Sequence, residues 1–305
     1  MNVTKEKKTL SQIKRPAQAA VRKASPSKAL NMLIESYLKE VDQDTDHLRA
    51  IILGEIGTGK TCLSTTCRFP VLLDSFDPGG TSSVILRPYI SDHRIMRMTV
   101  FENEIPANPK AFDKYSAHFD RLLRSGIFDK VGTYFPDSLT TLGDSIMYKV
   151  LSERGASPTD QPEQRDYLRQ QLYLINVVKQ WTTLPCDVVT TGHLIPEKNE
   201  DGAVISYNMM ITGKLTTKIP LLFNEIYATA VRRDASKNMV YTLRTVADAR
   251  YKVRTRMGAG IFDQFEPANI KALLKKAGKE YSDLPPLEMV DDPAPETNHQ
   301  TETKE

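Results

Sequence analysis

Features that would place a protein in a membrane or outside the cell are missing from this sequence. It has no run of about 18 or more apolar residues, the length that a membrane-spanning helix needs. The first residues, Met1–Lys5, lack the apolar core of a secretory signal. The three cysteines, Cys62, Cys67 and Cys186, are too few and too scattered for a disulfide framework or a four-ligand zinc site. We therefore expect a soluble, cytoplasmic protein with no membrane partner.

What the sequence does contain fits a globular domain. Of its 305 residues, 40% are hydrophobic and 26% are charged, and this length is sufficient for one large domain with a core. No internal repeat and no clear linker interrupts residues 29–283. We predict one domain over 25–283, between a disordered arm at 1–24 and a disordered tail at 284–305. Both ends are too poor in apolar residues to offset the entropy of ordering.

Charge is distributed unevenly along the chain. The net charge of +3 combines +7 over residues 1–28, −5 over residues 287–305 and +1 over the body between them. The two ends could simply be solvated tails. Alternatively, the basic arm contacts nucleic-acid phosphates, and the acidic tail competes for that site or recruits a partner. Charge alone leaves both interpretations open.

The first predicted element is an amphipathic helix. Ser25 and Pro26 resemble an N-cap followed by a proline in the first turn. Apolar residues then recur at helical spacing, and the polar residues 42–46 end the helix. The apolar stripe consists of Leu30, Leu33, Ile34, Tyr37, Leu38 and Val41.

After residue 46, short apolar runs alternate with amphipathic segments. This alternation is typical of an α/β domain with a parallel sheet. Beyond residue 191, turn-rich segments at 199–202 and 234–238 predict β-hairpins. We therefore predict an α/β fold with a mostly parallel central sheet, flanking helices and C-terminal β-hairpins. Strands are expected at 50–53, 71–73, 95–100, 187–191 and before Asp137, and helices at 62–67, 111–124, 139–151, 163–181 and 267–278.

The strongest motif is a glycine-rich loop, Gly54-Glu55-Ile56-Gly57-Thr58-Gly59-Lys60-Thr61. It fits G-x-x-x-x-G-K-[ST] and lies between a predicted strand and a predicted helix. Glycine tolerates the tight curl that points successive N–H groups at a phosphate, and the following helix adds the positive end of its dipole. Lys60 supplies a charge for the β- and γ-phosphates, and Thr61 supplies a hydroxyl for Mg²⁺. We predict that this loop, with Cys62, binds a nucleoside triphosphate, which we take to be ATP.

A phosphate-binding loop of this kind also needs an acid on a neighbouring strand to hold Mg²⁺, usually through water. Asp137 directly follows Pro136, which cannot donate to a central ladder and is read as the last residue of its strand. We predict that Asp137 is this acid. A plain surface aspartate at a strand end is the alternative.

The segment Asp137-Ser138-Leu139-Thr140 resembles the Walker B element of RecA-like ATPases. More widely, roughly 48–256 is similar to phage-encoded AAA/RecA-type nucleotide-binding proteins, some of which act in single-strand annealing and recombination. Three further segments carry the likeness: an acid and glycines at 72–80, a polar sensor at the end of 188–193, and a late basic motif at 249–254. The resemblance implies a RecA-like P-loop ATPase, acting in the host cytoplasm if a phage encodes it.

The resemblance also implies roles for single residues. The RecA-like pattern has a glutamate at the end of the second strand that polarises the attacking water; here the candidates are Asp77 and Asp74. We favour Asp77, because the adjoining loop 78–80 can present it, and a turn-forming aspartate is the alternative. His193 is expected to end a strand beside that of Asp137 and to donate to the γ-phosphate. Alternatively, a backbone carbonyl satisfies this histidine.

The late basic motif carries cations at alternate positions. On a strand, Lys252 and Arg254 project from one face, and Arg250 and Arg256 extend that face. Cations there would suit the γ-phosphate of a neighbouring subunit, as arginine fingers do in trans, and a solvated basic edge is the alternative. In the resembling proteins the segment after the sensor reaches toward DNA; here that segment is 194–218, which we expect to be flexible.

Three functions remain open. The leading prediction is a Mg²⁺-dependent NTPase that acts on single-stranded DNA in phage recombination or replication. It would work as a homo-oligomer with the site at the subunit interface, together with a single-strand-binding or replication protein. The second is a nucleotide-dependent adaptor or loader of a protein partner. The third is a P-loop kinase, for which Arg154 and Arg165 are the candidate lid arginines.

Overall fold

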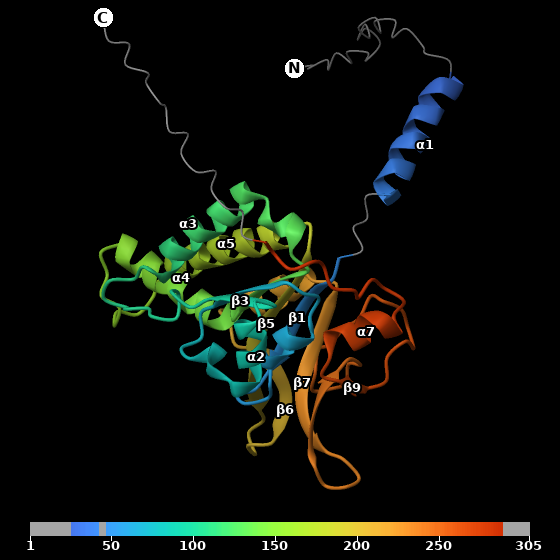
Figure 1. Cartoon of the computed structure of the whole chain (residues 1–305). Helices are drawn as coiled ribbons and strands as arrows, with labels where there is room; N and C mark the ends of the chain where they lie inside the picture. Colours follow the sequence, from blue (N-terminus) through green and yellow to red (C-terminus); the bar gives the residue numbers. More distant parts are fainter. Residues whose placement is uncertain (1–25, 43–46, 289–305) are drawn as a thin grey trace, which may run out of the picture. The chain divides into compact units, whose positions relative to one another are not determined.

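The computed structural model of the protein describes residues 26–42 and 47–288 (Figure 1). The arm that we predict at 1–24 lies outside these ranges, and so does the predicted tail at 284–305 apart from its first residues. Among the described helices, none combines the length and the apolar composition that crossing a bilayer requires.

The chain divides into two units, Met1–Thr45 and Asp46–Glu305. In the first unit, the described element is the predicted helix, α1 (Pro26–Asp42). We expected this helix to be part of a domain at 25–283, but the unit that holds the sheet begins at Asp46. The four described members of the apolar stripe of α1 are exposed: Leu30, Leu33, Ile34 and Tyr37.

The far end of the second unit also differs from the prediction. The backbone N–H of Leu284 donates to the carbonyl of Phe69 at 2.8 Å. Leu287 packs against one of the hydrophobic cores. The start of the predicted tail therefore belongs to the folded unit, because these two leucines give it backbone and apolar contacts.

A nine-stranded sheet forms the centre of the second unit, in the order β3-β2-β4-β5-β1-β7-β8-β9, with β6 paired to β5. Strands β1 to β5 and β7 run parallel to one another, whereas the pairs β5–β6, β7–β8 and β8–β9 are antiparallel. The predicted mostly parallel sheet is therefore confirmed. The strands are β1 (Arg49–Gly54), β2 (Val71–Ser75), β3 (Ile95–Met98), β4 (Thr133–Asp137), β5 (Asp187–Lys198), β6 (Val204–Met209), β7 (Glu225–Arg233), β8 (Met239–Arg244) and β9 (Phe265–Pro267).

Helices cover both faces of this sheet, as predicted. Helices α3, α4 and α5 lie together on one face, and α7 lies on the other side of the sheet (Figure 1). The α-helices of this unit are α2 (Arg87–Ser91), α3 (Ala111–Ser125), α4 (Leu139–Glu153), α5 (Gln164–Trp181), α6 (Leu215–Leu221) and α7 (Ile270–Lys276). Short 3-10 helices are η1 (Thr61–Thr66), η2 (Gly80–Ser82), η3 (Val84–Leu86) and η4 (Ile127–Lys130).

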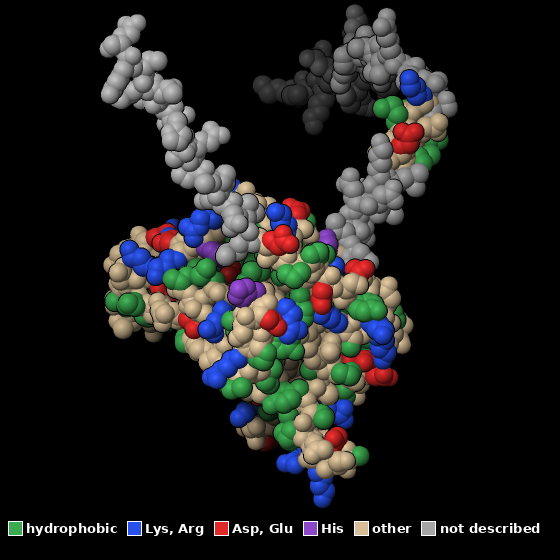
Figure 2. Space-filling view, in the orientation of Figure 1, with side chains coloured by type: hydrophobic (Ala, Val, Ile, Leu, Met, Phe, Trp, Pro, Cys, Tyr) green, Lys and Arg blue, Asp and Glu red, His purple; other side chains and the backbone are tan. Residues whose placement is uncertain are grey.

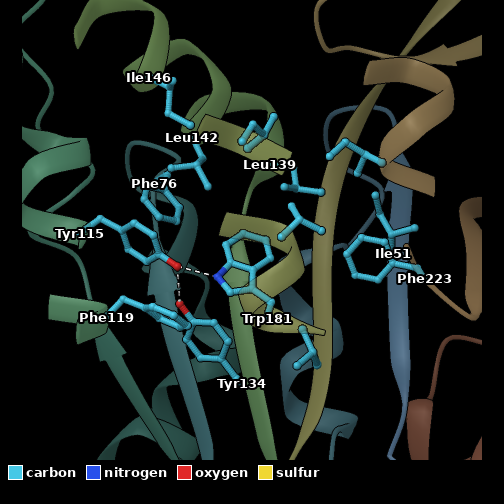
Figure 3. Close-up of a cluster of buried hydrophobic side chains, with 14 of the residues drawn as sticks. Ile51, Phe76, Tyr115, Phe119, Tyr134, Leu139, Leu142, Ile146, Trp181 and Phe223 are labelled. Atoms are coloured by element: carbon cyan, nitrogen blue, oxygen red, sulfur yellow. Dashed lines mark hydrogen bonds between the residues drawn. The ribbon is translucent and has the colours of Figure 1, made fainter. Parts of the chain in front are cut away.

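The core under α3, α4 and α5 contains a polar chain within its aromatic cluster (Figure 3). Trp181 Nε1 donates to Tyr115 Oη at 2.6 Å, and the hydroxyls of Tyr115 and Tyr134 lie 3.1 Å apart. Tyr134 Oη donates to Asp74 Oδ2 at 2.8 Å, and His118 Nε2 lies 3.3 Å from the other oxygen of Asp74. This carboxylate is buried in the core with its own partners, which leaves Asp77 as the candidate at the site.

Two hairpins extend the parallel strands beyond their carboxyl ends. β5 pairs with β1 up to His193 and then continues antiparallel to β6, and β7 continues past β1 to pair with β8. Both hairpins project from the same end of the sheet (Figure 1). The segment 194–218, which we expected to be flexible, is mostly ordered in β5, β6 and α6, because Leu215 and Ile219 are buried in the core.

Candidate nucleotide-binding site

The glycine-rich loop leaves β1 at its carboxyl end, in the tight curl that the motif predicts. Gly54 has no room for a side chain, because a Cβ there would lie 1.8 Å from Thr229 Oγ1. Gly59 has a φ of 85°, in the left-handed region that favours glycine. Thr58 Oγ1 fixes the curl from inside by hydrogen bonding to the Glu55 carbonyl at 2.7 Å and to Thr229 Oγ1 at 2.6 Å.

Lys60 lies inside this loop. Its ammonium donates to the carbonyls of Gly54 at 3.0 Å and Glu55 at 2.8 Å, and the residue is 7% exposed. Burial lowers the pKa of Lys60, although the negative charges of Asp137, Asp77 and Glu55 act to raise it. By contrast, the Ile56 side chain is 88% exposed, so this part of the loop presents backbone to the interior of the site and a side chain to solvent.

The helix predicted at 62–67 begins where we expected it, but it is the 3-10 helix η1 (Thr61–Thr66) rather than an α-helix. The hydroxyls of Ser64, Thr65 and Thr66 each donate to the carbonyl three residues earlier, and Cys67 is already extended. Hydroxyl side chains that bond locally compete with regular helical bonding. A six-residue 3-10 turn aligns few peptide dipoles, so the positive field at this loop comes mainly from its N–H groups and Lys60.

Asp137 lies at the end of β4, and its two oxygens face two threonines. Thr61 Oγ1 donates to Oδ2 at 2.6 Å, and Thr191 Oγ1, from β5, donates to Oδ1. Burial and the charge of Asp77 raise the pKa of Asp137, whereas the two hydroxyls and Lys60 act in the opposite direction. A buried carboxylate whose charge is this poorly compensated is suited to a cation.

The donor atoms at this position fit Mg²⁺. Thr61 Oγ1 and Asp137 Oδ2 are hard oxygen ligands on adjacent elements, and a Cβ added at Gly80 would lie 3.9 Å from the same carboxylate oxygen. No cluster of three or more His, Cys, Asp or Glu side chains that could hold a metal occurs in the described part of the chain. Such a sparse protein set suits Mg²⁺, which keeps several waters and takes further oxygens from a bound phosphate.

Asp77 and His193 form a pair at the same edge of the sheet. Asp77 Oδ2 lies 3.2 Å from His193 Nε2, and Oδ1 accepts hydrogen bonds from Ser138, at 2.8 Å, and Thr141. Burial raises the pKa of Asp77, but the hydrogen bonds from His193, Thr141 and Ser138 outweigh it, so the pKa lies below its ordinary value. Both oxygens of Asp77 accept hydrogen bonds. This geometry therefore suits a carboxylate that orients His193, and it is less suited to a general base with a free oxygen.

His193 itself lies on the strand between those of the loop and of Asp137, since β5 pairs with both β1 and β4. The predicted position of the His193 strand beside the Asp137 strand is therefore confirmed. However, His193 does not end its strand, because β5 continues to Lys198, where it pairs with β6. The His193 backbone N–H donates to Thr140 Oγ1 at 3.0 Å. Lys60, Thr61, Asp77, Asp137 and His193 are thus brought to one edge, whereas their roles in catalysis remain predictions.

The late basic motif is not the strand that we predicted. Within 250–256, only Arg254 forms a bridge, to Ile226 of β7, while the carbonyl of Arg250 accepts a hydrogen bond from Tyr207 of β6 at 2.9 Å, so no continuous ladder forms. The guanidinium of Arg254 donates to the carbonyl of Pro220, in the last turn of α6, at 2.9 Å and to that of Phe223, after this helix, at 2.6 Å. Lys252 Nζ donates instead to Asn208 Oδ1 at 3.2 Å. The four cations therefore do not share one face, and Arg254 has a structural role within its own subunit.

Replacing Arg254 with alanine should therefore destabilise the isolated protein. Two charge-assisted hydrogen bonds are lost, and we expect the free energy of unfolding to fall by about 1.5–3 kcal/mol. Urea unfolding measures this change. Arg250→Ala is the matched control, because that side chain is exposed. Unchanged stability combined with an activity defect only in assembled protein would instead support the predicted finger in trans.

A cavity of about 400 Å³ opens beside the loop. Tyr241, from β8, borders it, and a Cβ at Gly59 would lie 3.1 Å from the ring of this tyrosine. Sequence reasoning missed Tyr241, because an isolated aromatic residue on a predicted hairpin carries no motif. Other lining residues are Gly57, Cys62, Thr66, Ile85 and Ala268.

The α/β fold and this loop together define a P-loop NTPase domain. The family described as an AAA domain matches residues 46–257, more than two thirds of the chain, and the protein therefore belongs to that family. Among solved structures, the chain is similar to the flagellar accessory protein FlaH from Methanocaldococcus jannaschii. That similarity covers 72% of this chain and 84% of FlaH, with 10% sequence identity and a TM-score of 0.37. A comparison with curated proteins finds no match.

Proposed function

We propose that this protein is an ATP-binding, Mg²⁺-dependent NTPase that acts on single-stranded DNA in recombination or replication. The observation that carries the NTPase proposal is the direct contact of Thr61 with Asp137, at 2.6 Å, beside the buried ammonium of Lys60. These are the groups that P-loop enzymes use to hold phosphates and Mg²⁺. Thr61 and Asp137 would hold the ion, which supplies charge stabilisation at the phosphates.

In this proposal, the other polar groups at the edge orient the reaction. Lys60 stabilises charge on the terminal phosphates, and His193, held by Asp77, donates a hydrogen bond to the γ-phosphate. His193 is followed directly by the β5–β6 hairpin, so a change in its hydrogen bonding reaches a projecting element. The nucleoside occupies the cavity lined by Cys62 and Tyr241, because that cavity adjoins the loop and has an aromatic wall.

The surroundings of the loop support a homo-oligomer. Hydrophobic side chains gather over the region between α2 and the β7–β8 hairpin (Figure 2). Exposed apolar residues in the loop, in η3 or on that hairpin are Ile56, Val84, Ile85, Met239 and Tyr241. Exposed apolar surface of this kind marks interaction sites. A second copy of the chain would cover it and close the nucleotide site.

The kinase alternative has less support. Arg154 lies 3.2 Å from Glu163 and 3.0 Å from Asp166, and Arg165 lies 3.0 Å from Glu163. These ion pairs connect the two candidate lid arginines to the start of α5. A lid arginine must instead be free to close over a phosphate donor.

ATP turnover, measured with and without oligo(dT) and alongside the mass of the protein with a non-hydrolysable ATP analogue, tests the proposed function. DNA-stimulated turnover together with assembly supports it. Assembly with neither turnover nor DNA binding would identify an adaptor or loader. Phosphoryl transfer to a metabolite would identify a kinase, and either of these two results would overturn the proposal.

A further inference from the structure

Planar side chains from five separate segments form a stacked column beside the projecting hairpins. Arg232 lies 4.0 Å from the ring centroid of Phe265, and Arg244 lies 4.6 Å from the rings of both Phe265 and Tyr251. The column ends with Tyr207, whose ring is stacked on Tyr251 at 4.6 Å and 19°. Cation–π and stacking contacts hold these groups rigidly, which fixes the orientation of the last ring.

The Tyr207 end of this column borders a cavity of about 300 Å³, which we name the tyrosine pocket. Within the described part of the chain, Tyr251 is the one ring or cation stacked on Tyr207. The tyrosine pocket has apolar walls, including Leu53 and Val253, and lies on the sheet face opposite η1. It is therefore distinct from the cavity beside the phosphate loop, which η1 and Tyr241 line.

Two cations, Lys252 and Arg254, line the tyrosine pocket. Lys252 lines it and is exposed, with its ammonium 3.2 Å from Asn208 Oδ1, and the neighbouring Arg250 is also exposed. The nearby acid Glu197 accepts hydrogen bonds from Asn208 at 3.0 Å and from Ser206. Asp248 accepts from the backbone N–H of Tyr251 and is paired with Arg244 at 2.6 Å. With that pair neutral, Lys252 and Arg250 outnumber Glu197 here, so a polyanion with flat apolar groups complements both the charge and the shape of this surface.

We propose that the tyrosine pocket takes an unstacked base of a single-stranded nucleic acid. The base extends the column by stacking on Tyr207, while Lys252 and Arg250 contact the neighbouring phosphates. Every base has a planar face, so stacking of this kind tolerates any sequence. The inference rests on the proposed action on single-stranded DNA and assigns that action to a surface of this chain.

The tyrosine pocket is connected to the phosphate loop through two shared strands. On β1, Leu53 lines the pocket and Gly54 opens the loop. On β7, Ala228 lines the pocket, and Thr229 bonds to Thr58 of the loop at 2.6 Å. We therefore expect the affinity for the strand to differ between the ATP-bound and nucleotide-free protein.

Fluorescence anisotropy of labelled oligo(dT) on the full chain tests this inference. Tyr207→Ala should weaken binding by about 5- to 150-fold, since stacking on one aromatic ring contributes about 1–3 kcal/mol per base. Tyr207→Leu, which keeps apolar volume, should weaken binding similarly, whereas Tyr207→Phe should restore it. Lys252→Ala should reduce the salt dependence by about one charge. The control is Tyr281→Ala, which removes an exposed tyrosine that contacts Lys275 instead.

The outcomes separate this inference from the proposed function. If the parent binds oligo(dT) and both Tyr207→Ala and Tyr207→Leu bind equally well, the tyrosine pocket is not the base site, while the proposed function stands. If the parent binds no oligonucleotide with ATP, with ADP or without nucleotide, both fail. Loss of binding in Tyr207→Phe as well, with an unchanged melting temperature, would indicate that the hydroxyl rather than stacking is recognised and would also overturn the inference.

Discussion

Replacing Lys60 with alanine should lower ATP turnover by about 10²–10³-fold and weaken binding of Mg·ATP. The ammonium lies inside the loop between two carbonyls, close enough to Asp137 and Asp77 to be attracted by both. Alanine removes the positive charge without removing a glycine, so the curl of the loop persists. Calorimetry of the purified protein with Mg·ATP and a coupled turnover assay measure the two effects.

Lys179→Ala is the matched control for this substitution. Lys179 is exposed in the last turn of α5, which leads into the amino end of β5, so it lies at the opposite edge of the sheet from the loop. Its removal should leave both measurements unchanged. Equal heats of binding for the parent and Lys60→Ala would show that the loop does not hold the phosphates. A melting temperature measured without nucleotide distinguishes such a result from misfolding.

Some of this site could be predicted because its chemistry is local in the sequence. The eight residues from Gly54 to Thr61 are consecutive, and glycine, lysine and hydroxyl chemistry at that spacing has few other uses. The alternation of strands and helices likewise predicts a parallel sheet, and the carboxyl ends of parallel strands meet at one edge. That rule brings Asp137 to within 2.6 Å of Thr61, although 76 positions separate them.

What the sequence could not predict depends on contacts between distant side chains. Thr191, Ser138 and Thr141 hydrogen bond to the two acids of the site, but serine and threonine are common residues and these positions have no motif. The choice between Asp74 and Asp77 depended on which face of the sheet each one occupies. Asp74 is ruled out as the site residue because it is buried in the core and accepts a hydrogen bond from Tyr134. No local sequence pattern contains that information.

The prediction that the late basic motif forms a strand was wrong for a related reason. Alternate cations predict one face only if the segment is a strand, and 250–256 instead forms one isolated bridge, at Arg254, while Lys252 bonds to Asn208. The predicted helix after the loop failed because three consecutive hydroxyl residues bond to their own backbone. In both cases the residues were identified correctly, but the backbone geometry expected for them was wrong. A residue pattern therefore predicts which chemical groups are present better than it predicts how the backbone places them.

Asp137→Asn should abolish most Mg²⁺-dependent turnover, by about 10²-fold or more, since the carboxylate is the one acid in contact with Thr61 among the described residues. The amide oxygen of asparagine can accept from one of the two threonines, and its NH₂ group can donate to the hydroxyl oxygen of the other, so the packing of β4 should persist. Titrating turnover with MgCl₂ at saturating ATP measures the effect. Turnover and Mg²⁺ dependence equal to those of the parent would mean that another group holds the ion.

The same substitution should stabilise the protein when nucleotide and Mg²⁺ are absent. Burial raises the pKa of Asp137 above its ordinary value of 3.8, so the folded state holds this proton more tightly than the unfolded state does. Folding stability contributed by such an acid falls as the pH rises from the unfolded pKa through the folded pKa. Asparagine cannot ionise and avoids this loss. In EDTA, the melting temperature of Asp137→Asn should therefore exceed that of the parent, and the difference should be larger at pH 8 than at pH 4. A variant that melts below the parent at pH 8 would show that the buried charge is already compensated.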